Sequence, residues 1–198
     1  MRVLISAALA ALIVAGCAVP GTGPGATASL DQQFIDMMVP HHQGAVEMAK
    51  IAQQRAEHPE IKTMADAIIR AQEGEITQMK AWRKAWFGSD QTPPLDKMPM
   101  VPGMGGAHGG HGGESGTMDM AADVQQLRTA GNPFDKAFID AMIPHHESAI
   151  EAARVAQVKA ERPEIKELAR AIIADQQREI EQMKQWRQAW YGSAEVGR

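Results

Sequence analysis

Two pairs of adjacent histidines, each preceded by methionine, are the residues of this sequence best suited to binding a ligand. The pairs are His41-His42 and His145-His146, and methionines stand four residues before them at Met37, Met38 and Met142. Side chains four residues apart share one face of an α-helix, so a thioether and an imidazole can converge there. Soft sulfur with imidazole suits Cu(I), and imidazole with carboxylate oxygen also accepts Cu(II). The pattern therefore predicts a copper site, with Cu(I) favoured and Cu(II) possible.

The segment that follows each histidine pair supplies carboxylates and two more thioethers. Its apolar residues alternate four- and three-residue steps, as in a core-facing helix stripe. This stripe contains Glu75 and Met79 in one copy, and Glu179 and Met183 in the other. A buried carboxylate must be paired or bind a metal, and the alternative is that each Glu reaches water or pairs with Lys or Arg. The full set of candidate metal ligands is Met37, Met38, His41, His42, Met48, Glu75, Met79, Met142, His145, His146, Glu179 and Met183.

The two copies are unequal in sulfur. Methionine at helical spacing is often core filler, and a buried histidine can be a satisfied core residue, so ligation competes with plain packing. Three thioethers of the first copy are lost in the second, where Met37, Met48 and Met64 become Ala141, Ala152 and Leu168. We therefore expect the tighter Cu(I) site in the first copy.

An internal duplication must position these residues. Residues from Phe34 to Ser89 recur without a gap at an offset of 104 residues, as from His41 to His145. Each copy reads as two helices of roughly 27–29 residues, joined by a turn that ends at Pro59 or Pro163 and finished by Gly88 or Gly192. Pro40 and Pro144 are expected to interrupt the first helix of each copy. We predict an all-α fold, a four-helix bundle in which repeat 1 (30–89) and repeat 2 (131–193) pack as one domain.

The N-terminus has the pattern of an export signal. A positive start at Arg2 precedes a short apolar run and the sequence Val14-Ala15-Gly16-Cys17, which contains the chain's single cysteine. The run is too short to span a bilayer, so residues 1–16 are predicted to be a lipoprotein signal peptide, with Cys17 lipidated and 17–29 a tether. The alternative is an ordinary secretory signal with an incidental cysteine. We expect a protein that is exported and lipid-anchored in a bacterial cell envelope.

A glycine-rich linker at 90–130 joins the repeats. It carries further soft donors at Met98, Met100, Met104, His108 and His111, and it could act as a metal-capture strand or only as a biased tether. Residues 118–130 are expected to form a short helix.

Several other functions are disfavoured by what the sequence lacks. The formal charge of -4 argues against nucleic-acid binding, which requires clustered Lys and Arg. A structural zinc site would use Cys or more His, and a di-iron bundle would carry Glu-x-x-His motifs. With neither a nucleophile constellation nor a cofactor loop, the chain is predicted not to be an enzyme.

The motifs resemble one known family. Phe-x-x-x-Met-x-x-His-His-x-x-Ala at 34–45 and Gln-x-x-Glu-Ile-x-x-Met-x-x-Trp at 72–82 are similar to the ferritin-like domain-of-unknown-function family 305, and both recur in the second copy. The resemblance covers 30–89 and 134–193, two copies in tandem. It implies a helical bundle and copper binding or resistance outside the cytoplasm. By motif, it places metal roles on Met38, His41, His42, Met79, Met142, His145, His146 and Met183.

Three functions remain open at this point. The leading one is a copper-binding envelope lipoprotein for metal sequestration, transfer or resistance. The second is a structural or partner-binding bundle with no metal role, in which the histidines are satisfied core residues. The third and weakest is a redox enzyme that uses the bound metal. The protein partner, if there is one, is not specified by the sequence.

Overall fold

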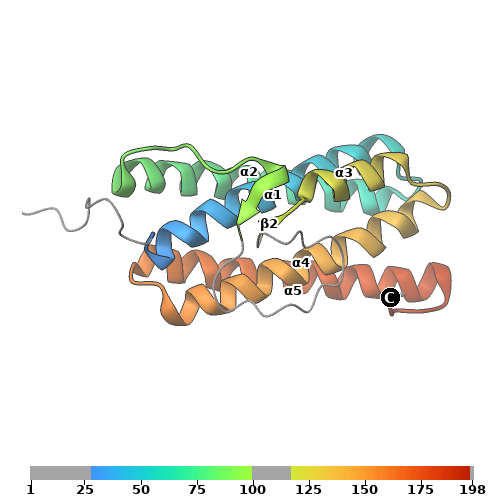
Figure 1. The fold of residues 1–198 in the computed structure, drawn as a ribbon. Helices are drawn as coiled ribbons and strands as arrows, with labels where there is room; N and C mark the ends of the chain where they lie inside the picture. The colour runs from blue at the N-terminus through green and yellow to red at the C-terminus, as the bar shows by residue number, and fades with distance from the viewer. Residues whose placement is uncertain (1–27, 100–116, 197–198) are drawn as a thin grey trace, which may run out of the picture.

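A computed structural model describes residues 28–99 and 117–196 as a bundle of four long helices (Figure 1). The long helices are α1 (Leu30–Arg55), α2 (Pro59–Phe87), α4 (Phe134–Lys159) and α5 (Pro163–Tyr191), and a short helix α3 (Met120–Thr129) lies between the two halves of the chain. The four-helix all-α prediction is confirmed, and the short helix falls within the predicted span. The four long helices run to 26 or 29 residues, close to the predicted length.

The two hairpins meet through their first helices. Helix α1 packs along α2, α4 packs along α5, and α1 and α4 contact each other between them. In Figure 1, α1 and α2 form the upper half, in blue to green, and α4 and α5 form the lower half, in orange to red. Buried alanines on the inner helices allow close approach, because they add no side-chain bulk. These fully buried residues are Ala45, Ala49, Ala149 and Ala153.

Local chemistry sets where the helices begin and end. Ser29 caps α1, its hydroxyl accepting a hydrogen bond from the Gln32 N–H at 3.2 Å. Gly88 and Gly192 close α2 and α5 in the left-handed conformation, with φ of 81° and 78°, where a side chain would be strained. The expected interruptions do not occur, because α1 continues through Pro40 and α4 through Pro144. Each histidine pair therefore stands one regular turn after the methionines on the same unbroken helix.

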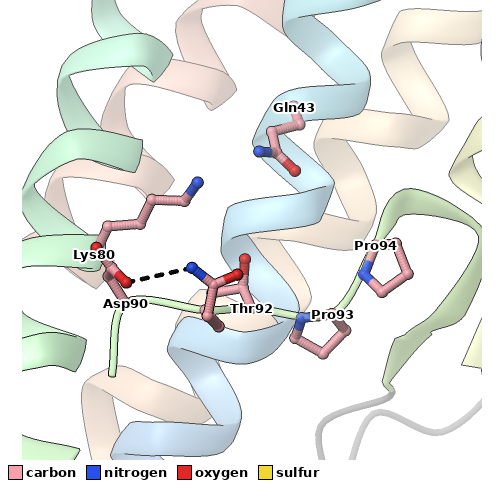
Figure 2. Close-up of a pocket in the computed structure, with 7 residues that line it drawn as sticks. Gln43, Lys80, Asp90, Thr92, Pro93 and Pro94 are labelled. Carbon is pink, nitrogen blue, oxygen red and sulfur yellow. Dashed lines mark hydrogen bonds between the residues drawn. The ribbon is translucent and has the colours of Figure 1, made fainter. Parts of the chain in front are cut away.

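The linker packs against the first hairpin where it is described. After α2 the chain crosses α1, and Asp90, Thr92 and Pro93 border a cavity of about 250 Å³ with Gln43 and Lys80 (Figure 2). A short 3-10 helix, η1 (Leu95–Lys97), leads into strand β1 (Met98–Pro99), which pairs antiparallel with β2 (Thr117–Met118). Met98 is buried, at 1% exposure, so this methionine belongs to the core instead of a free tether. No pattern in the sequence predicted this strand pair.

Two aspartates hold the hairpins together reciprocally. The Asp135 carboxylate, at the start of α4, accepts hydrogen bonds from the backbone N–H groups of Glu57 (3.0 Å) and His58 (2.8 Å) in the first hairpin's turn. Asp31, at the start of α1, accepts from Glu161 (3.0 Å) and from the next residue in the second hairpin's turn. Both carboxylates are 2% exposed. Each turn is therefore capped by the opposite repeat.

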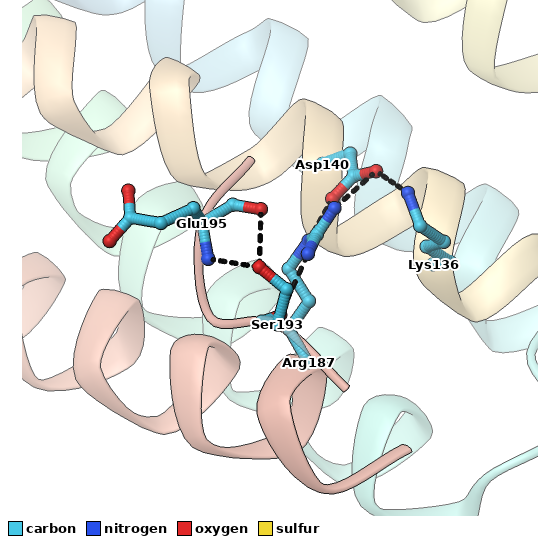
Figure 3. A network of polar contacts seen from close by, with 5 residues as sticks. All are labelled: Lys136, Asp140, Arg187, Ser193 and Glu195. Atoms are coloured by element: carbon cyan, nitrogen blue, oxygen red, sulfur yellow. Dashed lines mark hydrogen bonds and ion pairs between the residues drawn. The ribbon is translucent and has the colours of Figure 1, made fainter. Parts of the chain in front are cut away.

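One Arg–Asp ion pair joins the two helices of each hairpin. Arg187 of α5 donates to Asp140 of α4 at 2.5 Å and to the Ser193 carbonyl at 2.7 Å (Figure 3). Burial alone would raise the pKa of Asp140, but hydrogen bonds from Arg187 and Lys136 outweigh it and hold that pKa below 3.8. Arg83 and Asp36 repeat the arrangement in the first hairpin. These pairs fix the segment after each outer helix against the inner one.

Among the described residues, none of the helices combines the length and apolar content needed to cross a bilayer. Cys17, together with residues 1–16 and most of the tether, lies outside them, as do Met100, Met104, His108 and His111.

We predict that Asp135→Ala lowers the free energy of unfolding by about 2–3 kcal/mol, because two partly buried N–H donors lose a buried, charged acceptor. Urea unfolding followed by circular dichroism measures the change. The matched control is Asp175→Ala, which removes only an exposed ion pair with Arg178 and should cost less than about 1 kcal/mol. Equal, small losses in the two variants would contradict the reciprocal capping.

Candidate metal centre

The four histidines meet at the contact between α1 and α4. All four are buried, His41 at 1%, His42 and His146 at 0%, and His145 at 6% exposure. The rings of His41 and His145 face each other across the two repeats, with centroids 3.8 Å apart. Each ring lies 6.2 Å from its own neighbour in the chain, so the imidazoles form one continuous group. The predicted inward position of the histidine pairs is confirmed by this geometry.

Ser148 fixes the proton of His41. The Ser148 hydroxyl donates its single proton to the His145 carbonyl at 2.7 Å. It can then only accept from His41 Nε2, which lies 2.8 Å from Oγ. His41 therefore carries its proton on Nε2, and its Nδ1 keeps a lone pair.

The carboxylates of the outer helices fix the other two rings. Glu75 of α2 and Glu179 of α5 each hold an oxygen 2.7 Å from the Nε2 of His42 and of His146, respectively. An ionised carboxylate only accepts, so Nε2 donates and Nδ1 of the neutral ring keeps its lone pair. This carboxylate–histidine pair is the arrangement that orients metal-binding imidazoles and raises their basicity. Glu75 and Glu179 are partly exposed, at 18% and 21%, so they lie at the edge of the stripe as the alternative had it, but each pairs with a histidine and not with Lys or Arg.

Five buried ring nitrogens are left without a partner, at least one on each imidazole. The Nδ1 atoms of His41, His42, His145 and His146 make no hydrogen bond, nor does Nε2 of His145. Unpartnered polar atoms are rare in protein interiors, because each loses its hydrogen bonds to water on burial. A nitrogen whose lone pair makes no hydrogen bond is the kind of ligand that a metal ion requires.

Burial also keeps two of the rings neutral. It is the largest cause of a pKa well below 6.5 for His41, and repulsion from His145, His42 and His146 lowers that pKa further. Burial likewise lowers the pKa of His145, with repulsion from His146 and His42 added and a weaker opposing effect of the His41 backbone. Both rings therefore stay uncharged at neutral pH and can donate electron pairs.

The methionines form two buried clusters. The first sulfur cluster consists of Met37, Met38, Met79, Met98 and Met120. The second consists of Met48, Met142 and Met183, with Met64 packed against it from the surface. The first cluster is richer in thioethers, as expected, but for a different reason. Met48 belongs with the second hairpin's methionines, while the linker contributes Met98 and Met120 to the first.

Within the parts of the chain that the structure describes, no group of three or more His, Cys, Asp or Glu side chains is arranged to hold a metal ion. Imidazole nitrogens and thioethers are soft donors of the kind that suits a monovalent thiophilic ion.

Some contributors escaped the sequence reasoning. Ser148 lies opposite Gly44 at the repeat offset, a difference visible in the sequence whose meaning depends on how α1 crosses α4. Gln72 and Gln176, three residues before Glu75 and Glu179, are buried at 3%, with their Oε1 atoms unpartnered. They are additional oxygen donors near the same layer of the bundle.

Comparison with solved structures gives strong matches. CopM in the Cu(I)-bound form is 42% identical, covers 82% of this chain and 98% of its own, and superposes with a TM-score of 0.65. The Cu(II)-bound form of CopM is 47% identical over 81% of this chain and 97% of that one, with a TM-score of 0.63. A putative secreted protein from Streptomyces coelicolor is 26% identical, with coverage of 86% and 98% and a TM-score of 0.69.

A curated relative also matches over a short stretch. The uncharacterized protein L153 of Acanthamoeba polyphaga mimivirus is 40% identical over 51 residues, which make up 26% of this chain and 34% of that protein. The match thus spans about a third of that relative's length. The profile of the family "Domain of unknown function (DUF305)" matches residues 31–187 in one stretch that includes both hairpins. That match covers most of the sequence, and the chain belongs to the DUF305 family.

Proposed function

We propose that this protein binds copper in the interior of its bundle, as Cu(I), and serves to sequester it or hand it on. The observation that carries the proposal is the set of buried Nδ1 lone pairs whose opposite nitrogens are fixed by Glu75, Glu179 and Ser148. The copper-bound forms of CopM, the similar solved structure, support the choice of metal.

Each hairpin supplies one half of the centre. In the first, His42 and His41 would bind the ion with Met38 and Met79 as thioether ligands. In the second, His146 would bind with Met142 and Met183. Copper is cargo in this scheme, so the ligands need only bind and release it, and no catalytic step is assigned. Thioethers and neutral imidazoles release no proton on binding, which favours exchange at constant pH.

The location is proposed from the N-terminus alone. A lipid on Cys17 would hold the bundle at the cell envelope through the 17–29 tether. There it would meet copper that arrives from outside the cell.

Anaerobic competition with the chelator bathocuproine disulfonate tests the function. We expect the wild-type chain to withdraw Cu(I) from the chelator and the double variant His42→Ala/His146→Ala to lose that ability. Glu75→Gln/Glu179→Gln should weaken binding about 10- to 100-fold, because the rings lose the charged acceptor that orients them. The control is Glu73→Gln on the exposed face of α2. If the histidine double variant competes as well as wild type, the bundle is a structural scaffold instead.

The buried rings also predict a pH dependence of the metal-free protein. The pKa values of His41 and His145 lie below 6.5 in the folded state, so the unfolded chain binds more protons once the pH falls below that value. Stability should be constant from these groups above pH 7. It should fall by about 1.4 kcal/mol per histidine between pH 7.5 and 5.5. Urea unfolding at both pH values measures the loss, and His41→Gln/His145→Gln should remove it. An unchanged slope in that variant would mean that the pH dependence comes from other groups.

A further inference from the structure

A cavity of about 1410 Å³ opens between α3, α4 and α5, separate from the interior sites of the proposed function. Its wall includes His145 of α4, Met48 of α1 and Met120 of α3. Asp140, Lys184 and Glu195 also line it, so the ion-pair network of Figure 3 lies at its edge. Of the four site histidines, only His145 borders this cavity.

His145 and Met120 approach the same point on α1. A Cβ placed on Gly44 would lie 3.4 Å from His145 Nε2 and 3.4 Å from Met120 Cβ, with Met120 Cγ at 3.8 Å. An imidazole nitrogen and the stem of a thioether side chain therefore converge over the bare backbone of Gly44. Met48 follows one helical turn later on the same face of α1 and is 1% exposed. Three soft donors thus border one space.

The opposite repeat shows what this arrangement lacks. Ser148 stands at the position equivalent to Gly44, and its hydroxyl occupies His41 Nε2. Ala152 stands at the position equivalent to Met48. No hydroxyl reaches the His145 ring, and both of its ring nitrogens are unpartnered. The methionines Met48 and Met120 lie on its side, whereas the corresponding side of His41 has neither. The two repeats therefore differ at the positions of the candidate metal donors.

Access differs in the same direction. On the first hairpin, the segment around Asp90–Pro94 lies across α1 and borders the small cavity beside Gln43 and Lys80 (Figure 2). The equivalent residues of the second hairpin, Glu147 and Lys184, line the large cavity. That cavity's wall carries six acidic side chains against two basic ones, and the acidic excess attracts cations. The acidic residues are Asp119, Asp123, Asp140, Glu147, Glu151 and Glu195.

We propose that His145 Nε2, Met48 and Met120 form a third soft-metal site, open to solvent, which takes a monovalent Cu(I) or Ag(I) ion from outside the bundle. A neutral imidazole has one lone-pair nitrogen, so His145 presents Nε2 here and carries its proton on Nδ1. The site rests on the same donor chemistry as the proposed function but uses a different set of atoms. Its position beside the buried rings makes it a receiving site for the interior.

Native mass spectrometry of the full chain with Ag(I), which is redox-stable, tests the site by counting bound ions. Gly44→Ser installs the hydroxyl that Ser148 provides in the other repeat, and it should occupy His145 Nε2 and remove one ion while every ligand remains. Met48→Leu/Met120→Leu should also remove one ion. Glu73→Gln, on the exposed face of α2 and outside both sites, should leave the count unchanged.

The outcomes separate this site from the proposed function. Thermal unfolding by circular dichroism confirms that each variant is folded before ions are counted. In His42→Ala/His146→Ala, loss of the interior ions with the cavity ion retained supports both ideas, and an ion count equal to wild type overturns only the interior ligands. If Gly44→Ser and Met48→Leu/Met120→Leu both bind as many Ag(I) ions as wild type, the third site does not exist and the proposed function stands.

Discussion

Burial of four imidazoles at the crossing of α1 and α4 is the constraint on which the surrounding structure depends. A charged ring at His41 or His145 would lose its hydration without a compensating partner, so burial holds the pKa values of these two residues down. The other two rings, of His42 and His146, each have one nitrogen satisfied by Glu75 or Glu179 of the outer helices. The helices are unbroken and carry small residues on their inner faces. This allows the ring centroids of His41 and His145 to lie 3.8 Å apart.

The duplicated architecture builds this layer of histidines by using one sequence pattern twice. The two hairpins meet through α1 and α4, and each outer helix carries one of the carboxylates. Each carboxylate bonds a histidine of its own hairpin. The contacts between the halves are the packing of the core, the facing imidazoles, the hydroxyl of Ser148 and the reciprocal aspartates. Small changes on one side can therefore alter one half of the centre alone.

Much of this was predictable from periodicity, since the offset of the repeat, the glycine caps and the inward histidines follow from local patterns. The pairing of Glu75 with His42 was not predicted, because residue spacing places a carboxylate on a helix face without specifying its partner. Helix interruption at Pro40 was wrong, because the surrounding packing outweighs one missing backbone bond. The allocation of Met48 to the second sulfur cluster depends on the crossing of α1 and α4, which no single-helix pattern specifies. In the same way, no local pattern predicted that Met98 of the linker is buried.

The reciprocal aspartates have a consequence for how such a chain could have arisen. Asp31 caps the turn of the second hairpin and Asp135 caps the turn of the first, so the two contacts are the same contact related by a rotation. A single hairpin that carries both the aspartate and the turn is complementary to itself, and two such molecules would close as an isologous pair. Covalent fusion of that pair removes the concentration dependence of assembly. It also frees each half to diverge, as Gly44 and Ser148 have done.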